Sequence, residues 1–239
     1  MGQLKRQTLG DVFGSVGHLV FKNRGGTNYI SHRPVTYATP QDDRSVSIRN
    51  QFRFTSKLSK SINSIDLIKK IWRNKYLKYY SVYHKIFDAN YHRFNYDNPS
   101  GNPVLTPEIG IALGNPEIKL NGTNLIIKAD PLLGKLNLDP LKSYFIVTAS
   151  LLVFRYSTKP DDPPVFHTIN GKVTPLDLTQ PISLTTHISS PGVNAIPPAD
   201  EYISRLWSVL IILDEYQNPV NYSETLSWAS NTIDSNSNT

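Results

Sequence analysis

The chain has 239 residues, a net charge of +6 and no cysteine. A chain of this length can bury a sizeable hydrophobic core, and the lack of cysteine excludes a disulfide framework and thiolate metal sites. Its longest apolar run, Tyr144 to Phe154, is about half of the roughly 20 residues that span a bilayer. We therefore predict no membrane span, and the glycine-interrupted first residues show no conventional secretion signal.

Charge is divided unevenly along the chain. Residues 1–100 contain 17 Lys and Arg against 6 Asp, whereas residues 101–239 contain 8 Lys and Arg against 13 Asp and Glu. A basic half can hold phosphates or an acidic partner, and opposite halves of identical subunits can attract each other head to tail. The alternative is that the lysines only solvate helix surfaces.

Residues 1–38 predict a glycine-rich β-ribbon arm. Apolar and aromatic residues flank Asn23-Arg24-Gly25-Gly26, whose paired glycines supply the positive φ of a tight hairpin. A lone two-stranded ribbon is only marginally stable in water, so we expect it to pack against the rest of the chain or against a neighbouring molecule. The contacts with a neighbour would come from Val16, Leu19, Phe21, Tyr29 and Ile30 as buried side chains, and from Arg24, Arg33 and Arg49 as ionic partners.

Residues 39–100 predict a basic, tyrosine-rich region of two helices. The first begins with Thr39 as its cap and Pro40 at its first position, and it ends near Ser61. Its apolar stripe is imperfect, with Phe52 or Arg53 at one position, so we expect it to be partly solvated. The second runs from residue 65 to residue 87, with apolar or aromatic residues every three or four positions and therefore one aromatic side.

The second predicted helix also carries a basic set, consisting of Lys69, Lys70, Arg73, Lys75, Lys78 and Lys85. Lysines interleaved with aromatic rings are typical of surfaces that bind nucleic acid or acidic polymers. In the structural alternative, which we favour, the tyrosines face the core and the lysines face water. Rings that stack on bases usually lie on sheets or loops rather than along a helix.

Residues 101–228 predict short antiparallel strands broken by turns. The expected strands cover residues 116–120, 124–128, 144–154, 183–188 and 207–213. Asn121-Gly122 predicts a hairpin between the first two, and the long apolar runs predict central strands that are covered on both faces. The overall expectation is an α+β chain whose second half is an antiparallel β-sandwich similar to immunoglobulin or fibronectin modules, followed by a polar tail at residues 229–239 that is disordered when alone.

No catalytic or metal constellation is visible in the sequence. The six histidines are dispersed, and His84 and His92 lie eight residues apart without the spacing of a zinc or nucleophile motif. Adjacent acidic pairs such as Asp161-Asp162 have side chains that diverge in regular structure, so they form no dyad by themselves. We predict that the protein is not an enzyme and needs no cofactor or metal.

The order of the motifs resembles a family of uncharacterised proteins from Bacteroidota and their phages. The resemblance is carried by Gly14-Ser15-Val16-Gly17-His18-Leu19-Val20-Phe21, by Tyr29-Ile30-Ser31-His32-Arg33-Pro34, by Thr39-Pro40-Gln41 before a helix with Arg49-Asn50-Gln51-Phe52, and by the β-rich second half. The interval between Gln41 and Arg49 is longer than is usual in that family. The resemblance implies no known activity, and it favours a structural or surface-assembly role over an enzyme.

Two functions follow as hypotheses. The first is a structural subunit of a larger particle or filament, such as a virion, a tail or a cell-surface apparatus, in which the ribbon exchanges strands or pairs edges with a neighbouring copy. Its partners would be copies of itself and other particle proteins, in a virion or an extracellular assembly. The second is a module that grips nucleic acid or an acidic glycan through the basic helices.

Overall fold

The structure is a computed structural model that describes residues 2–3, 14–24, 27–33, 39–74, 81–93, 102–107, 110–121, 123–139, 142–156, 164–188 and 202–229. The chain forms two compact units, Met1–Val46 and Ser47–Thr239, and each is considered by itself. The predicted polar tail lies outside the described residues from position 230 onward. None of the helices in the described ranges is long and apolar enough to cross a membrane.

The first unit contains a four-stranded antiparallel sheet, which we call the N-terminal sheet. Its strands are β1 (Gly2–Gln3), β2 (Gly14–Val16), β3 (Leu19–Arg24) and β4 (Thr27–His32), in the spatial order β1-β4-β3-β2. The predicted hairpin is confirmed, because Arg24 pairs with Thr27 across the glycine pair. A second tight turn joins β2 to β3, with Gly17 at a φ of +57° as type II′ turns require. The ribbon therefore has two more strands than the sequence predicted.

Three helices follow, α1 (Asp43–Asn63), α2 (Asp66–Asn74) and α3 (Val82–Tyr91). The predicted cap at Thr39 is wrong. The carboxylate of Asp42 accepts a hydrogen bond from the Ser45 N–H at 3.0 Å, so Asp42 is the capping residue and α1 begins three residues after the predicted start. The single long second helix is also wrong, because α2 ends at Asn74 and α3 starts at Val82.

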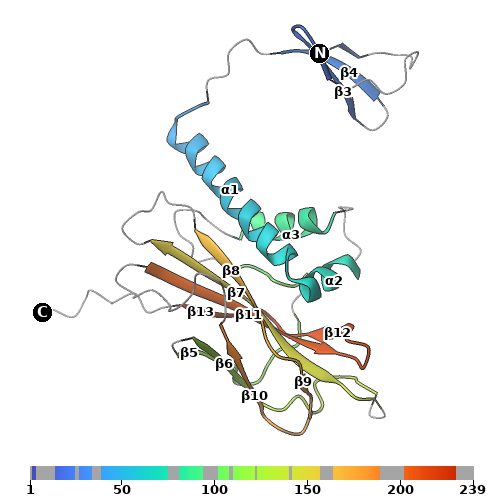
Figure 1. The fold of residues 1–239 in the computed structure, drawn as a ribbon, viewed down its shortest axis with the longest axis vertical. Coiled ribbons are helices and arrows are strands. Elements are labelled where there is room, and N and C mark those ends of the chain that lie inside the picture. The colour runs from blue at the N-terminus through green and yellow to red at the C-terminus, as the bar shows by residue number, and fades with distance from the viewer. Residues whose placement is uncertain are drawn as a thin grey trace, which may run out of the picture. The chain divides into compact units, whose positions relative to one another are not determined.

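The second unit also contains two antiparallel sheets (Figure 1). The larger has six strands, β7 (Phe145–Tyr156), β8 (Val165–Asn170), β9 (Thr174–Pro175), β11 (Tyr202–Leu213), β12 (Pro219–Tyr222) and β13 (Leu226–Ala229). The smaller has the order β10-β6-β5, with β5 (Glu117–Asn121), β6 (Asn124–Ala129) and β10 (Ile182–His187). All five predicted strands and the Asn121-Gly122 hairpin are present, and β8, β9, β12 and β13 were not predicted.

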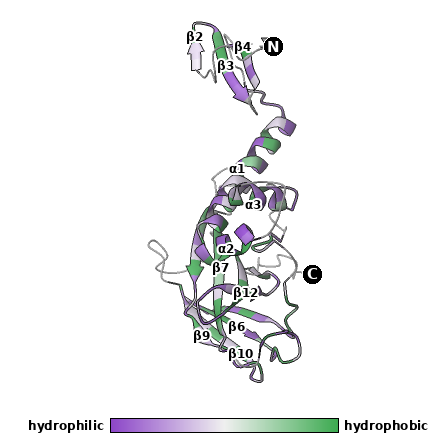
Figure 2. Ribbon diagram, turned by 90° about the vertical axis from the view of Figure 1, so that its right-hand side faces the viewer, coloured by the Kyte–Doolittle hydropathy of each residue, from purple (hydrophilic) through white to green (hydrophobic). Residues whose placement is uncertain are grey.

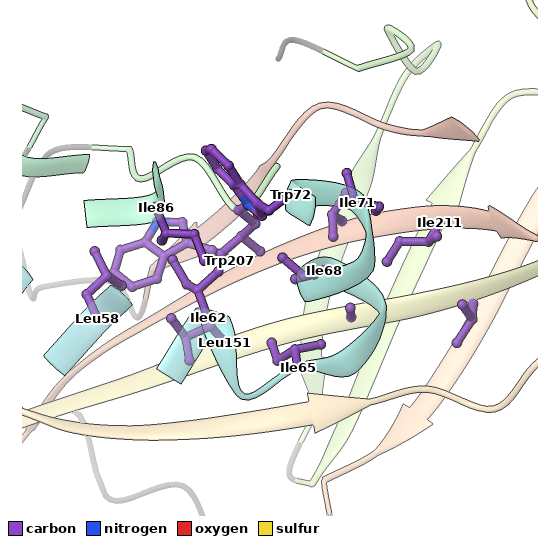
Figure 3. Close-up of a cluster of buried hydrophobic side chains, with 14 of the residues drawn as sticks. Leu58, Ile62, Ile65, Ile68, Ile71, Trp72, Ile86, Leu151, Trp207 and Ile211 are labelled. Atoms are coloured by element: carbon purple, nitrogen blue, oxygen red, sulfur yellow. The ribbon is translucent and has the colours of Figure 1, made fainter. Parts of the chain in front are cut away.

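One face of the larger sheet is covered by the helices. Leu58, Ile62, Ile68 and Trp72 from α1 and α2 belong to one buried cluster with alternate side chains of β7 and β11 (Figure 3). Trp207 of β11 lies inside this cluster and is 1% exposed. Burial of such side chains contributes about 1.5–3 kcal/mol each, so this cluster is a main source of stability.

The opposite face of the larger sheet packs on the smaller sheet through a second buried cluster. Leu152 and Leu210 of the larger sheet meet Leu125 and Ile127 of β6 in this cluster. The prediction that the long apolar runs are covered on both faces is thereby confirmed. The fold is α+β with mostly antiparallel strands, arranged as helices, a larger sheet and a smaller sheet.

Residues 102–107 strap the helical layer to the larger sheet. The fully buried amide of Asn90 donates to the Val104 carbonyl at 3.1 Å and accepts from the Val104 N–H at 2.9 Å. The indole of Trp72 donates to the Leu105 carbonyl at 2.8 Å, and the Thr225 hydroxyl accepts from the Leu105 N–H at 3.2 Å. The strap therefore satisfies its polar backbone groups on both sides.

Replacing Asn90 by alanine should lower the free energy of unfolding by about 2–3 kcal/mol, because it leaves buried backbone groups of the strap without their partners. Urea denaturation followed by tryptophan fluorescence measures this change. Asn74→Ala at the exposed end of α2 is the matched control and should change stability by less than about 0.5 kcal/mol. Equal effects of the two substitutions would contradict the role of the strap.

Candidate assembly interface

Seven of the eight predicted interface residues lie in or directly beside the N-terminal sheet. They are Val16 in β2, Leu19, Phe21 and Arg24 in β3, Tyr29 and Ile30 in β4, and Arg33 immediately after β4. Arg49 lies in α1 and belongs to the second unit, so the structure does not bring it together with the others within one unit. The interface predicted from sequence is therefore reduced to the sheet itself.

The strand register gathers four apolar residues on one face of the sheet. Paired residues of neighbouring strands point to the same side, and the register pairs Val16 with Leu19 and Phe21 with Ile30. Leu19 and Phe21 are two positions apart in β3 and share that side. Tyr29 pairs with Lys22 and lies on the opposite face. We call Val16, Leu19, Phe21 and Ile30 the apolar face.

The apolar face lacks a buried core. Val16 is 71% exposed and Leu19 is 43% exposed, while Phe21 and Ile30 are half-buried. Across the part of this unit whose burial is described, the one buried side chain is polar: Asn28 accepts a hydrogen bond from the Asn23 amide at 2.8 Å. The sheet therefore holds its strands by backbone hydrogen bonds and one polar pair, and it leaves apolar area in contact with water.

The edge strands of this sheet are β1 and β2, and β2 is the edge beside the apolar face residues Val16 and Leu19. Val16 and Leu19 flank a two-residue turn and form a hydrogen-bonded pair, so Ser15 and Val20 form the next, non-hydrogen-bonded pair. The N–H and C=O of Ser15 consequently point away from β3, toward the edge. Such groups can pair with a strand of another molecule.

Two histidines meet beside Arg33, which the sequence did not indicate. The rings of His18 and His32 are stacked with centroids 5.6 Å apart and planes 7° apart. The Arg33 N–H donates to the His18 carbonyl at 2.6 Å, which extends the β3–β4 ladder past its last paired residues. This backbone hydrogen bond holds Arg33 close to the end of the apolar face.

The members of the predicted polyanion-binding set differ in their exposure. Lys70 and Arg73 are exposed on α2 and Lys69 is half-buried there, while Lys75 and Lys78 lie outside the described residues. The prediction that Lys85 faces a ligand is wrong. Its side chain is 8% exposed and its ammonium donates to the Trp72 carbonyl in the last turn of α2, at 3.4 Å. A lysine in this position stabilises the carboxyl end of a helix and does not face a ligand.

A surface that the sequence did not single out lies on α1 and α3. The ring centroid of Phe52 on α1 lies 5.1 Å from that of Phe87 on α3. On α3 itself, the Phe87 ring lies 5.4 Å from the Tyr91 ring and 6.2 Å from the Tyr83 ring. Ile48, one turn before Phe52, is 50% exposed and Phe52 is 56% exposed. We call these five residues the helical aromatic surface. The signal in the sequence is the spacing of four, between Ile48 and Phe52 on α1 and between Tyr83, Phe87 and Tyr91 on α3.

One apolar groove opens in the second unit, with a volume of about 820 Å³. Leu133, Leu136, Leu138, Leu176 and Leu178 line it. Its charged lining includes Asp177, whose pKa is lowered because the Thr179 hydroxyl and N–H donate to the carboxylate, so that this group is held in a local turn. Within the described ranges, no three His, Asp or Glu residues gather as metal ligands would.

The buried position of Lys85 predicts a stability effect. Lys85→Ala should lower the free energy of unfolding by about 1–3 kcal/mol, because it removes the donor to the Trp72 carbonyl and the packing of the lysine stem. Lys70→Ala, at an exposed position of α2, should change it by less than about 0.5 kcal/mol. Thermal and urea denaturation compare the two variants, and a stability loss confined to Lys70→Ala would contradict the assignment.

No protein-family model, curated protein or solved structure matches the chain. The resemblance to proteins of Bacteroidota and their phages therefore stays a prediction. The case for a function has to be made from the residues and geometry described above.

Proposed function

We propose that the protein is a non-enzymatic structural subunit that self-assembles into a larger particle or filament, and that its N-terminal sheet makes the contact. The observation that carries this proposal is the unburied apolar face of a sheet that forms its own compact unit. Full burial of an apolar side chain of this size is worth about 1.5–3 kcal/mol. Covering Val16, Leu19, Phe21 and Ile30 therefore supplies several kcal/mol of association energy.

The edge of the sheet supports the same contact. Pairing of β2 with a strand of the next copy would satisfy the outward-pointing backbone groups of Ser15 and extend the sheet across two molecules. Hydrogen bonds along the edge fix the register of such a pairing, and the apolar face supplies the affinity. Edge pairing and face burial together explain how a small sheet can serve as a specific connector.

Charge favours a second copy as the partner. Residues 1–38 contain five Lys and Arg against one Asp, whereas residues 101–239 hold an excess of acidic residues. Opposite charges on two parts of the same chain steer identical molecules into head-to-tail encounters. Head-to-tail contacts produce rings where the rotation between subunits closes and open filaments where it does not.

The same proposal includes the type of β-sandwich and the kind of particle. The two packed sheets of the second unit would be an immunoglobulin-like or fibronectin-like sandwich, extended by a helical layer on one face. A particle of a virion, a tail or a cell-surface apparatus fits the resemblance to Bacteroidota and phage proteins. The binding of nucleic acid or an acidic glycan remains the alternative, supported by the exposed Lys70 and Arg73 and weakened by the burial of Lys85.

Val16→Lys tests the connector without disturbing the fold, because this side chain is already 71% exposed and a lysine on an edge strand opposes pairing. We expect the unmodified protein to sediment as oligomers and Val16→Lys to sediment as a monomer, with the same urea midpoint. Val173→Lys, at a 38% exposed position of the second unit, is the matched control and should leave the oligomers intact.

Deletion of residues 1–38 provides an independent arm of this experiment. The remaining chain keeps Asp42, the cap of α1, and both hydrophobic clusters, so it should retain its circular dichroism and cooperative unfolding. At micromolar concentration it should sediment as a monomer. A truncated chain that stays as oligomeric as the full chain would overturn the proposal.

A further inference from the structure

The helical aromatic surface is a second candidate contact, separate from the N-terminal sheet. Its exposed members Ile48 and Phe52 lie one turn apart on α1, and their neighbours on α3 are Tyr83, Phe87 and Tyr91. Aromatic residues gathered on an exposed face are typical of protein interfaces. Figure 2 shows hydrophobic and hydrophilic residues interspersed along α1, as expected for a helix with one side packed and another available.

The rings of this surface are arranged for contact with a protein more than with bases. Phe87 stacks on Tyr91 with planes 23° apart, and the Tyr83 hydroxyl is hydrogen-bonded to Ser56 at 2.8 Å. Because these rings already use their faces and polar atoms on each other and on α1, they form a fixed apolar platform. A stacked base needs a free ring face. Of these rings Phe52 is exposed, whereas Tyr83, Phe87 and Tyr91 are half-buried.

Basic residues surround the platform. Between Ser47 and Asn63, α1 carries Arg49, Arg53, Lys57 and Lys60 and no acidic residue. Arg53 and Lys57 are exposed, and the acidic residue of α3 is Asp88. The chemistry that fits this surface is an aromatic or apolar side chain flanked by carboxylates.

The same chain presents that chemistry in the turn between β11 and β12. Tyr216 is 76% exposed, and the adjacent Asp214 and Glu215 are acidic. The Asp214 carboxylate accepts from the Tyr216 N–H at 3.0 Å and from the Asn218 N–H at 2.7 Å, so the turn is held rigidly. No Lys or Arg follows Arg205 in the sequence, and the turn itself carries Asp214 and Glu215 without a basic residue.

We propose that the helical aromatic surface of one copy binds the turn Asp214–Gln217 of a second copy, with Tyr216 on the aromatic platform and Glu215 beside Arg53 and Lys57. The two surfaces differ, so the contact is heterologous and propagates from copy to copy. It rests on the self-assembly proposed above but does not involve the N-terminal sheet, so failure of this contact can be distinguished from failure of the sheet contact. A contact built on one helix face and one turn is small, so it is weak in isolation and effective when a second contact holds the copies together.

Charge reversal tests the pairing in the full chain. Arg53→Glu and Glu215→Arg should each raise the concentration needed for assembly about three- to tenfold, and the double variant should restore much of the loss. Lys172→Glu, at an exposed position between β8 and β9, is the control and should have no effect. Sedimentation velocity over a concentration series measures these shifts. Failure of the double variant to recover would overturn the pairing.

Cysteine cross-linking tests the geometry directly, because the natural chain has no cysteine. Full-length Lys57→Cys mixed with a differently tagged Asn218→Cys should form a mixed disulfide several times faster than Lys57→Cys mixed with Lys172→Cys. Repeating the reaction on the Val16→Lys background separates this contact from the sheet, since the preference should persist there at higher concentration. Equal rates for the two mixtures would overturn the proposal. Binding of a fluorescent single-stranded oligonucleotide that Arg53→Glu abolishes would do so as well, by assigning the surface to nucleic acid.

Discussion

The need to cover both faces of β7 and β11 organises the second unit. Over residues 145–153 of β7 and 204–213 of β11, nearly every side chain is buried, including Val147, Leu151, Leu152, Trp207 and Leu210. Because alternate side chains point to opposite faces, one layer cannot bury them all. The helices cover one face and the smaller sheet covers the other. Between the sheets, the hydroxyls of Thr148 and Thr186 satisfy each other at 2.9 Å, so these two polar side chains do not break the core.

The N-terminal sheet shows the opposite balance. Its strands pair in good register, yet Asn28 is its buried side chain and Val16 remains mostly exposed. A sheet without a buried apolar layer gains little from the hydrophobic effect, which is the main favourable term in folding. Its stability and specificity therefore improve when a partner covers the apolar face, and this coupling of stability to binding suits a connector.

Prediction from the sequence succeeded where a hydrophobic pattern fitted one kind of structure. The runs that became β7 and β11 could be predicted because continuous apolar segments rich in β-branched and aromatic residues indicate strands that are buried on both faces. Prediction failed where a pattern fitted two structures equally well. The expected apolar stripe of α1 contained Phe52 or Arg53, and this prediction was wrong. Both are exposed, whereas Phe54 is buried with its ring centroid 5.5 Å from that of Phe166 in β8. The 3.6-residue period likewise continues through residues 65–87, although α2 and α3 are separate helices, so periodicity could not show that Lys85 turns inward to the end of α2.

The same ambiguity explains why the helical aromatic surface was missed. Its rings come from two helices, and a pattern read along one segment cannot show that Phe52 and Phe87 meet. With the sheet and this surface, each copy would carry two different contacts. Two weak contacts per subunit give an assembly far more stable than either contact alone, because the second forms at a high effective concentration once the first is made. A chain built in this way can remain separate when dilute and assemble cooperatively when concentrated, which is the behaviour that a particle or filament subunit needs.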